Sequence, residues 1–339
     1  MKNKIEDANS DINELLSADE VDSKLRSPYI QHGYRHPNLS ARECMLSVFK
    51  CNNETCNFWT HFGPCLYLLY TSWVYFKENS ISNPLMWPLV SYVFIACLLF
   101  LTSALAHAFC TMSPKELGLR KGDASNIHDL MFLLDFSTIS MQVVGSGQGF
   151  FFYLGVPESQ YTLYNSPSCF FTVCLLMSIV ATYLTGTTMM NTTKQTSYMA
   201  VGSTATLYIF SLSPFIFKLH QTKMASKDDV ELKNLFFGQI FLYIIGALLY
   251  GFKIPERMAP GYFDYFGNSH NLMHIITAMG HCKIFSIFVK AISVQKKLPI
   301  YKITIWNTLG VVVTCAVANL FIAVGMFFYW DEQEHEKDS

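Results

Sequence analysis

The sequence has 339 residues, of which 14% are Asp, Glu, Lys or Arg and 51% are hydrophobic, whereas a soluble protein carries about 25% charged residues. Of the 49 charged residues, 15 lie in the first 50 positions and 6 in the last nine, which leaves 28 for the 280 positions between. This central part is too apolar for a water-soluble globule and favours one multi-span membrane domain. The net charge of -1 gives no sign of a nucleic-acid partner.

The N-terminal part is polar and precedes the first apolar run. Residues 1–28 lack the apolar stretch of a signal peptide and are predicted to form a disordered tail. Residues 29–54 are predicted to form an amphipathic juxtamembrane segment. Within it, Ser40 and Glu43 have the spacing of a capping box, so we expect a short helix to begin there and to lie along the membrane surface. The apolar side of this helix would consist of Met45, Leu46, Val48 and Phe49.

The central domain, residues 55–330, contains eight long apolar windows with little charge. A helix needs about 20 mostly apolar residues to cross the bilayer core, so each window is predicted to be a transmembrane helix and the protein to be all-α. An acidic tail, residues 331–339, follows the last span. The expected spans are 56–76, 84–111, 127–154, 168–188, 198–217, 235–252, 270–289 and 303–329.

The Lys and Arg residues in the connections between spans indicate opposite membrane orientations in the early and late parts of the sequence. With the N-terminus in the cytosol, the connection after the second span places Lys115, Arg120 and Lys121 inside, as the positive-inside rule requires. Two later basic connections, after the fifth and seventh spans, would then lie outside. Because the early spans usually dominate, we predict a cytosolic N-terminus, and eight spans return the C-terminus to the same side.

Few ionisable residues fall at membrane depth, where such side chains are costly and indicate function. The second span ends with Ser103 and His107 one turn apart, the third span carries Asp135, and the seventh begins with His270 and His274 at positions i and i+4. Two histidines one helical turn apart can share a metal ion. The alternative interpretation is structural, with polar residues at a helix start and hydrogen bonds between helices.

Span parity brings these residues to one face of the membrane, because the second span ends at the face from which the third and seventh spans begin. A rise of 1.5 Å per residue places Asp135 on the order of 12 Å in from this face, deeper than the histidines. Three neutral imidazoles with an open position are typical of a zinc site that holds water. An adjacent carboxylate can orient a ligand or accept a proton from that water. His281 lies about 10.5 Å beyond His274 along the helix, so we expect it to line a cavity or to pack.

Two further stretches are unusual. Glu54, Asn57 and His61, at positions i, i+3 and i+7, form a polar stripe on the first span, which is either an interfacial face or a part of the protein that closes the site. The connection before the seventh span is rich in turn residues and is predicted to form a tight, salt-bridged loop. Its charged residues include Glu256, Arg257 and Asp264.

Five ordered motifs resemble those of a known family. They are NETCNFWTH at 53–61, SALAH at 103–107, LLDF at 133–136, PERMAPGYFDYFGNSH at 255–270 and HNLMH at 270–274. Together they resemble the progestin and adiponectin receptor family, and the similarity extends from about Gly33 to the eighth span. The sequence is most similar to the membrane progestin receptor branch, closest to its gamma type. The resemblance implies a seven-transmembrane-helix core with an additional C-terminal eighth helix, a cytosolic N-terminus and a zinc ion near the cytosolic face.

The resemblance also implies roles for particular residues. By match of motif, the zinc ligands would be His107, His270 and His274, with Asp135 contributing through water and Ser103 beside them. The implied function is a plasma-membrane receptor for progesterone-like steroids that signals through heterotrimeric G proteins. Ceramidases among the family's relatives imply an alternative, a zinc-dependent intramembrane amidase acting on ceramide or a related lipid, with Asp135 and Ser103 as catalytic residues. In a third hypothesis, zinc only ties the second and seventh spans together in a scaffold.

Overall fold

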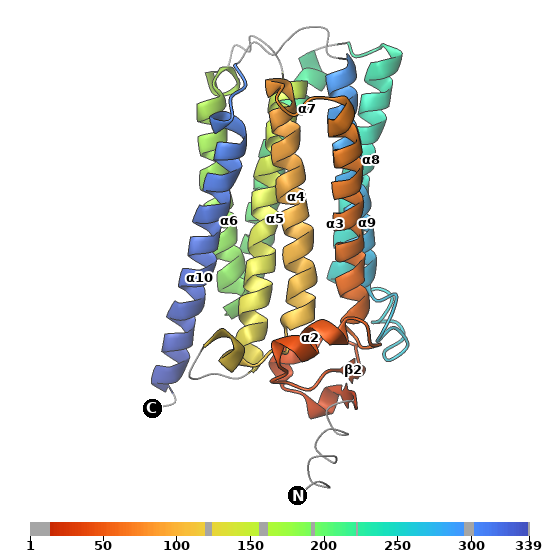
Figure 1. Ribbon diagram of the computed structural model, residues 1–339, viewed down its shortest axis with the longest axis vertical. Helices are drawn as coiled ribbons and strands as arrows, with labels where there is room; N and C mark the ends of the chain where they lie inside the picture. Colours follow the sequence, from red (N-terminus) through yellow and green to blue (C-terminus); the bar gives the residue numbers. More distant parts are fainter. Residues whose placement is uncertain are drawn as a thin grey trace, which may run out of the picture. The chain divides into compact units, whose positions relative to one another are not determined.

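The computed structural model describes residues 14–118, 124–155, 162–190, 194–221, 223–294 and 302–337. These residues contain nine α-helices and two short strands, which confirms the prediction of an all-α membrane protein. Eight of the helices are 23 residues or longer (Figure 1). They are α3 (Thr55–Glu78), α4 (Trp87–Phe109), α5 (Ala124–Leu154), α6 (Pro167–Met190), α7 (Lys194–Gln221), α8 (Lys227–Phe252), α9 (Ser269–Val294) and α10 (Val311–Lys337).

Seven segments of the described residues, one for each of the helices from α4 to α10, are long and apolar enough to cross a membrane. They correspond to the second to eighth predicted spans. The first predicted span corresponds to α3, which has membrane-spanning length, but its Trp and Tyr side chains lower its hydropathy. The first span is therefore supported by length, and the other seven by length and composition.

Short turns begin or join several of these helices. One π-helical turn leads directly into α10, and the helix continues through the acidic tail as far as Lys337. The short turns are η3 (Pro84–Met86), η4 (Pro114–Leu117), η5 (Thr162–Asn165) and the π-helical η6 (Trp306–Gly310).

Helix α8 begins earlier than the predicted span, at Lys227 instead of residue 235. The reason is a reciprocal cap, in which the Asp229 backbone N–H donates to Ser226 Oγ at 3.1 Å and the Ser226 backbone N–H donates to Asp229 Oδ2 at 3.2 Å. Such a capping box satisfies two backbone donors at a helix start. The charged first turns of α8 are thus helical although they are too polar for the bilayer core.

The chain divides into two compact units. Helices α3, α4, α5, α8 and α9 each contribute turns to both units, whereas α6, α7 and α10 belong to the second unit. Unit 1 consists of Met1–Gly63, Ser103–Phe132 and Leu242–Ala278, and unit 2 of Pro64–Thr102, Leu133–Phe241 and Met279–Ser339.

Unit 1 begins with an ordered N-terminal segment, which differs from the disorder predicted for residues 1–28. Strand β1 (Leu16–Ser17) pairs antiparallel with β2 (His32–Tyr34), and two single turns, η1 (Ala18–Glu20) and η2 (Ser23–Leu25), lie between them. The prediction is therefore wrong for residues 14–28, and residues 1–13 lie outside the described residues. The segment is ordered because an apolar cluster forms within it. The buried residues of this cluster are Val21, Ile30 and Tyr34.

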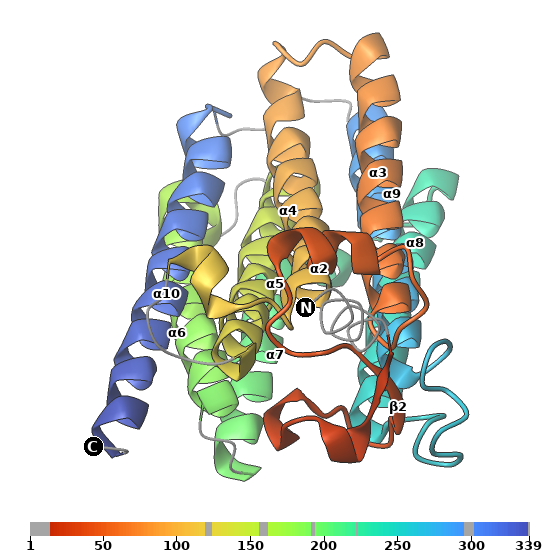
Figure 2. The same ribbon diagram turned by 60° about the horizontal axis from the view of Figure 1, so that its bottom comes forward.

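Helix α2 (Ala41–Ser47) follows, and its predicted capping box is confirmed, since Ser40 Oγ accepts from the Glu43 backbone N–H and Glu43 accepts from that of Ser40. Figures 1 and 2 show α2 across the end of α4. Val48, just beyond the helix, packs against Phe58 and Ala104. The other residues of the predicted apolar side are exposed, namely Met45, Leu46 and Phe49.

In unit 2, α6 packs against both α7 and α10. A chain of neutral polar groups joins these helices to α5: Asn319 Nδ2 donates to Ser178 Oγ at 3.0 Å, Ser178 Oγ donates to Ser140 Oγ at 3.0 Å, and Ser140 lies 2.8 Å from Thr182 Oγ1. Fully buried aromatic side chains also pack in unit 2, most of them against one another. They include Tyr92, Phe150, Phe170, Phe215, Phe236 and Phe288.

Candidate metal centre

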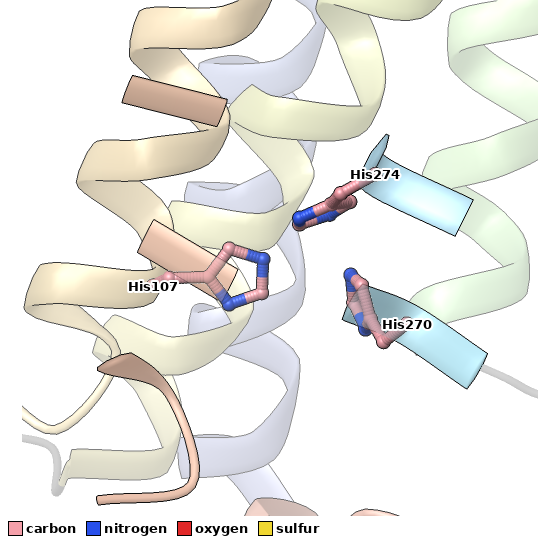
Figure 3. Close-up of side chains that lie close together, drawn as sticks. All are labelled: His107, His270 and His274. Atoms are coloured by element: carbon pink, nitrogen blue, oxygen red, sulfur yellow. The ribbon is translucent and has the colours of Figure 1, made fainter. Parts of the chain in front are cut away.

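The three histidines predicted as ligands lie together in unit 1. His107 belongs to the last turn of α4, and His270 and His274 belong to the first two turns of α9. One ring nitrogen from each lies within 4.8 Å of the other two. Figure 3 shows the three side chains pointing toward one another, His107 from one side and the α9 pair from the other. His107 and His274 are buried and His270 is half-buried.

The ring of His107 is oriented by Glu54. Its Nδ1 lies 2.7 Å from Glu54 Oε2, which also accepts a hydrogen bond from Asn57 Nδ2 at 2.8 Å. Burial raises the pKa of the Glu54 carboxyl, but the hydrogen bond and charge of His107 lower it further, so the pKa lies below its usual range. An ionised carboxylate only accepts hydrogen bonds, so Nδ1 carries the proton. His107 Nε2, which is buried and has no hydrogen-bond partner among the described residues, keeps its lone pair.

The ring of His274 is held in the same way by the start of α3. Its Nδ1 lies 3.3 Å from the carbonyl oxygen of Asn57 and 3.1 Å from Thr60 Oγ1. A carbonyl oxygen only accepts, so Nδ1 donates and Nε2 again keeps its lone pair. The ring of His61 stacks on that of His274 with centroids 3.6 Å apart. The polar stripe of Glu54, Asn57 and His61 therefore contacts the histidine triad, which favours the site-closing interpretation over the interfacial one.

The start of α9 is fixed by the preceding loop. Glu256 is buried and accepts hydrogen bonds from the backbone N–H of Ser269, at 2.7 Å, and from Ser269 Oγ. Asp264 is also buried and accepts from the backbone N–H groups of two residues of the N-terminal segment. The prediction of a tight loop is thus correct, although Arg257 is exposed and forms no ion pair among the described residues. Asp264 Oδ2 lies 3.0 Å from His32 Nδ1, and both buried loop carboxylates accept hydrogen bonds from backbone amides.

The remaining candidates are not members of the histidine triad. Ser103 lies one turn before His107 on α4, and its buried Oγ has no hydrogen-bond partner among the described residues. Asp135 is buried on α5 in unit 2, three residues beyond the last α5 residue of unit 1. His281, also in unit 2, has its Nδ1 3.1 Å from Gln142 Nε2, and its backbone carbonyl accepts from Tyr92. His281 therefore packs within unit 2, one of its two expected roles.

The sequence interpretation missed two residues that hold the histidines in place. Thr60 contacts the ring of His274, and its only signal was its position three residues after Asn57 on the polar stripe. Arg35 is buried and donates to the backbone carbonyl of His107. A single arginine in a polar segment carries no pattern, so Arg35 had no signal.

The donor set is compatible with a zinc ion. It consists of three imidazoles, two of them with Nδ1 hydrogen-bonded so that Nε2 is free to coordinate, and three histidines with an open fourth position are a known zinc geometry. The hydrogen bond from Nδ1 to a carboxylate or carbonyl is also the usual arrangement around zinc-bound histidine. The buried Nε2 of His107, with no partner of its own, is the observation that a metal would explain.

The fold and this site define an all-α integral membrane protein with a buried triad of histidines at one end of its spans. The model of the family described as haemolysin-III related matches residues 49–285. The chain belongs to this family, which includes the progestin and adiponectin receptors, and the predicted resemblance is confirmed.

Individual relatives agree with this assignment. The chain is 26% identical over 329 residues to membrane progestin receptor gamma-B of Danio rerio, covering 91% of each chain. It is 27% identical over 323 residues to membrane progestin receptor delta of Homo sapiens, covering 91% of this chain and 89% of the relative. It is also 25% identical over 257 residues to the adiponectin receptor protein of Drosophila melanogaster, covering 73% of this chain and 52% of the relative.

Proposed function

We propose that this protein is a plasma-membrane receptor for progesterone-like steroids, with a zinc site formed by His107, His270 and His274. Similarity to membrane progestin receptors over nine-tenths of the chain supports the receptor. The observation that carries the zinc site is the convergence of the three rings within 4.8 Å. Signalling through a heterotrimeric G protein, with the N-terminus in the cytosol, follows from the family resemblance.

In this proposal the residues around the site orient the metal ligands. Glu54 and the Asn57 carbonyl hold two of the rings in one tautomer, and a zinc ion held by His107, His270 and His274 would connect the end of α4 to the start of α9. A bound Zn²⁺ also supplies Lewis acidity, lowering the pKa of a coordinated water or polarising a carbonyl. The receptor would use the link between α4 and α9, and not the Lewis acidity, to stabilise its ligand-binding conformation.

One observation favours a second candidate, an intramembrane amidase acting on ceramide or a related lipid. The Ser103 hydroxyl is buried, lies one turn from His107 and has no hydrogen-bond partner among the described residues, so it is free to bind a substrate carbonyl or a water. Asp135 is the buried carboxylate of the span that follows. In the amidase, Asp135 would accept the proton of the attacking water.

The deciding experiment uses the purified full-length protein in lipid nanodiscs. Metal content is measured by mass spectrometry, and tritiated progesterone and a ceramide with a labelled acyl chain are offered in parallel. The test variants are His274→Ala and Asp135→Ala. The matched control is His281→Gln, because His281 is a buried histidine of the same helix outside the triad.

We expect one zinc per chain in the wild type and the control, none in His274→Ala, and saturable progesterone binding by the wild type without fatty-acid release. Fatty-acid release that both test variants abolish, with no saturable steroid binding, would replace the receptor by the amidase. If the wild type contains zinc but neither binds the steroid nor hydrolyses ceramide, only the hypothesis of a zinc-stabilised scaffold would remain. Absence of zinc from the wild type would contradict the proposed metal site.

A further inference from the structure

The N-terminal segment before α3 contacts α4 and the loop that precedes α9, and residues 30–54 are here named the collar. Its first contact is with α4. Arg35 is 5% exposed, and its guanidinium donates to the carbonyl oxygens of His107 and Ala108, both at 2.7 Å, and to Ser47 Oγ at 2.7 Å. The last carbonyls of a helix have no partner within the helix, and a cation there also complements the helix dipole. Arg35 thus fixes the backbone from which His107 projects.

The second contact of the collar is with the loop before α9. Asp264 accepts hydrogen bonds from the backbone N–H of Gln31 at 3.0 Å and of His32 at 2.9 Å, and its Oδ2 lies 3.0 Å from His32 Nδ1. The same loop carries Glu256, which caps Ser269, the residue directly before His270. The collar is therefore connected to the start of α9 through one loop.

Two glycines show how closely the collar and this loop fit. Gly33 has φ +91°, and a Cβ at this position would lie 2.7 Å from the ring of Tyr265. Gly261, on the loop, has φ +86°, and a Cβ there would lie 2.7 Å from Gln31 Oε1. A side chain at Gly33 would clash with the Tyr265 ring, whereas at Gly261 the exposed Gln31 side chain could move aside; at both positions the positive φ disfavours other residues. The collar therefore does not dock loosely, and a shift of the loop moves the collar.

The third contact is direct, because the collar ends at Glu54, whose carboxylate holds the ring of His107. We propose that docking of the collar and metal binding by the triad are thermodynamically coupled, with Arg35 and Asp264 as positioning residues. Docking sets the spacing between His107 and the α9 pair, and an ion that joins α4 to α9 in turn holds the collar in place. This coupling rests on the zinc site proposed above.

Coupling between two binding events is reciprocal: the factor by which docking raises zinc affinity is the factor by which zinc favours docking. Zinc occupancy would therefore change the conformation of the collar, which lies outside the membrane-spanning helices. In the other direction, a partner that pulls the collar away would weaken zinc binding. This gives the site a route of regulation that needs no ligand in the membrane.

The test measures both sides of the coupling on the full-length protein in nanodiscs. Zinc affinity is obtained by competition with a chelating dye, and docking by hydrogen exchange of residues 30–54 with and without a chelator. The variants are Arg35→Gln and Asp264→Asn, which act on the two contacts separately. The matched control is Arg42→Gln, because Arg42 is an exposed arginine of the same segment.

We expect each variant to bind zinc about 10- to 100-fold more weakly than the wild type, as is usual when the groups behind metal ligands are changed, and the control to bind normally. Chelation of the wild type should accelerate exchange in the collar and leave α6 and α10 unchanged. If the wild type holds one zinc but its collar exchanges equally with and without chelator, the coupling is wrong and the zinc site stands. A wild type without zinc overturns both.

Discussion

The two units bury polar groups of different kinds. Among the described residues of unit 1 the buried charged side chains are Arg35, Glu256 and Asp264, and each of them bonds backbone amides or carbonyls. In the described part of unit 2 the buried charged side chain is Asp135, and buried neutral hydroxyl and amide groups such as those of Ser178 and Asn319 make contacts between helices. A buried charge is costly unless it is fully hydrogen-bonded, and helix ends supply unpaired backbone groups. The buried charges of Arg35 and Glu256 thus bond the end of α4 and the start of α9, next to His107 and His270.

Of the changes that should affect the two units differently, removal of the metal is expected to have the largest effect on stability. An ion present at 1,000 times its Kd stabilises the folded state by about 4 kcal/mol, so a chelator should lower the thermal midpoint of the wild type by several degrees. The loss should begin in unit 1, which differential hydrogen exchange can locate. His274→Ala serves as the control, because it should already have the lower midpoint and should not respond to chelator. An equal response of the variant and the wild type would contradict the prediction.

Glu54→Gln tests the charge that orients His107 without changing the shape of the side chain. The variant should bind zinc about 10- to 100-fold more weakly, which corresponds to about 1.4 to 2.7 kcal/mol. Zinc affinity is again measured by dye competition. Glu116→Gln, at a carboxylate of unit 1 that accepts from the Ala41 backbone N–H at 3.2 Å, is the matched control and should bind zinc normally. Unchanged affinity of Glu54→Gln would show that the carboxylate does not support the site.

Gly149→Ala tests unit 2, where packing dominates. An added Cβ would lie 2.3 Å from the ring of Phe288, and overpacking of this kind costs about 1 to 3 kcal/mol. The thermal midpoint should fall while the zinc affinity stays unchanged. Gly202→Ala is the control, because a Cβ there meets nothing within 4 Å. A loss of zinc affinity in Gly149→Ala would mean that strain in unit 2 reaches the triad.

Asn319→Leu should give the smallest effect. It removes the donor to Ser178 Oγ and to the Cys315 carbonyl, and hydrogen bonds between membrane helices contribute about 0.6 kcal/mol on average. The midpoint should fall less than in Gly149→Ala, as measured in the same thermal scan. If Asn319→Leu were the more damaging of the two, the neutral polar chain rather than aromatic packing would hold unit 2 together.

The helices could be predicted from the sequence because a bilayer requires long windows without charge. Helix α5 ends at Leu154 and α8 at Phe252, as predicted. Apolar windows do not predict the ends of a helix that extends beyond the apolar core, as at the capped start of α8. It also missed the ordered turns of residues 14–28, because their stability comes from a small apolar cluster whose members are far apart in a polar segment.

The triad could be predicted because spacing and parity are both visible in the sequence. His270 and His274 are one turn apart, and the count of crossings brings His107 to the same face. The groups that hold them were harder to predict, because their partners are backbone atoms. Arg35 bonds carbonyl oxygens and Asp264 bonds amide N–H groups, and every residue type carries both. Only the fold decides which of them are nearby.

The contact between His32 and Asp264 has a consequence for biosynthesis. The two residues are 232 positions apart, and at about 5 to 20 residues per second the ribosome needs roughly 12 to 46 s to make the chain between them. During this time the contacts of the collar with α4, such as those of Arg35 and Glu54, can form, but its contact with the loop before α9 cannot. Its docking is completed only after the loop before α9 has been synthesised, so a docked collar reports that a nascent chain has already produced α3 to α8.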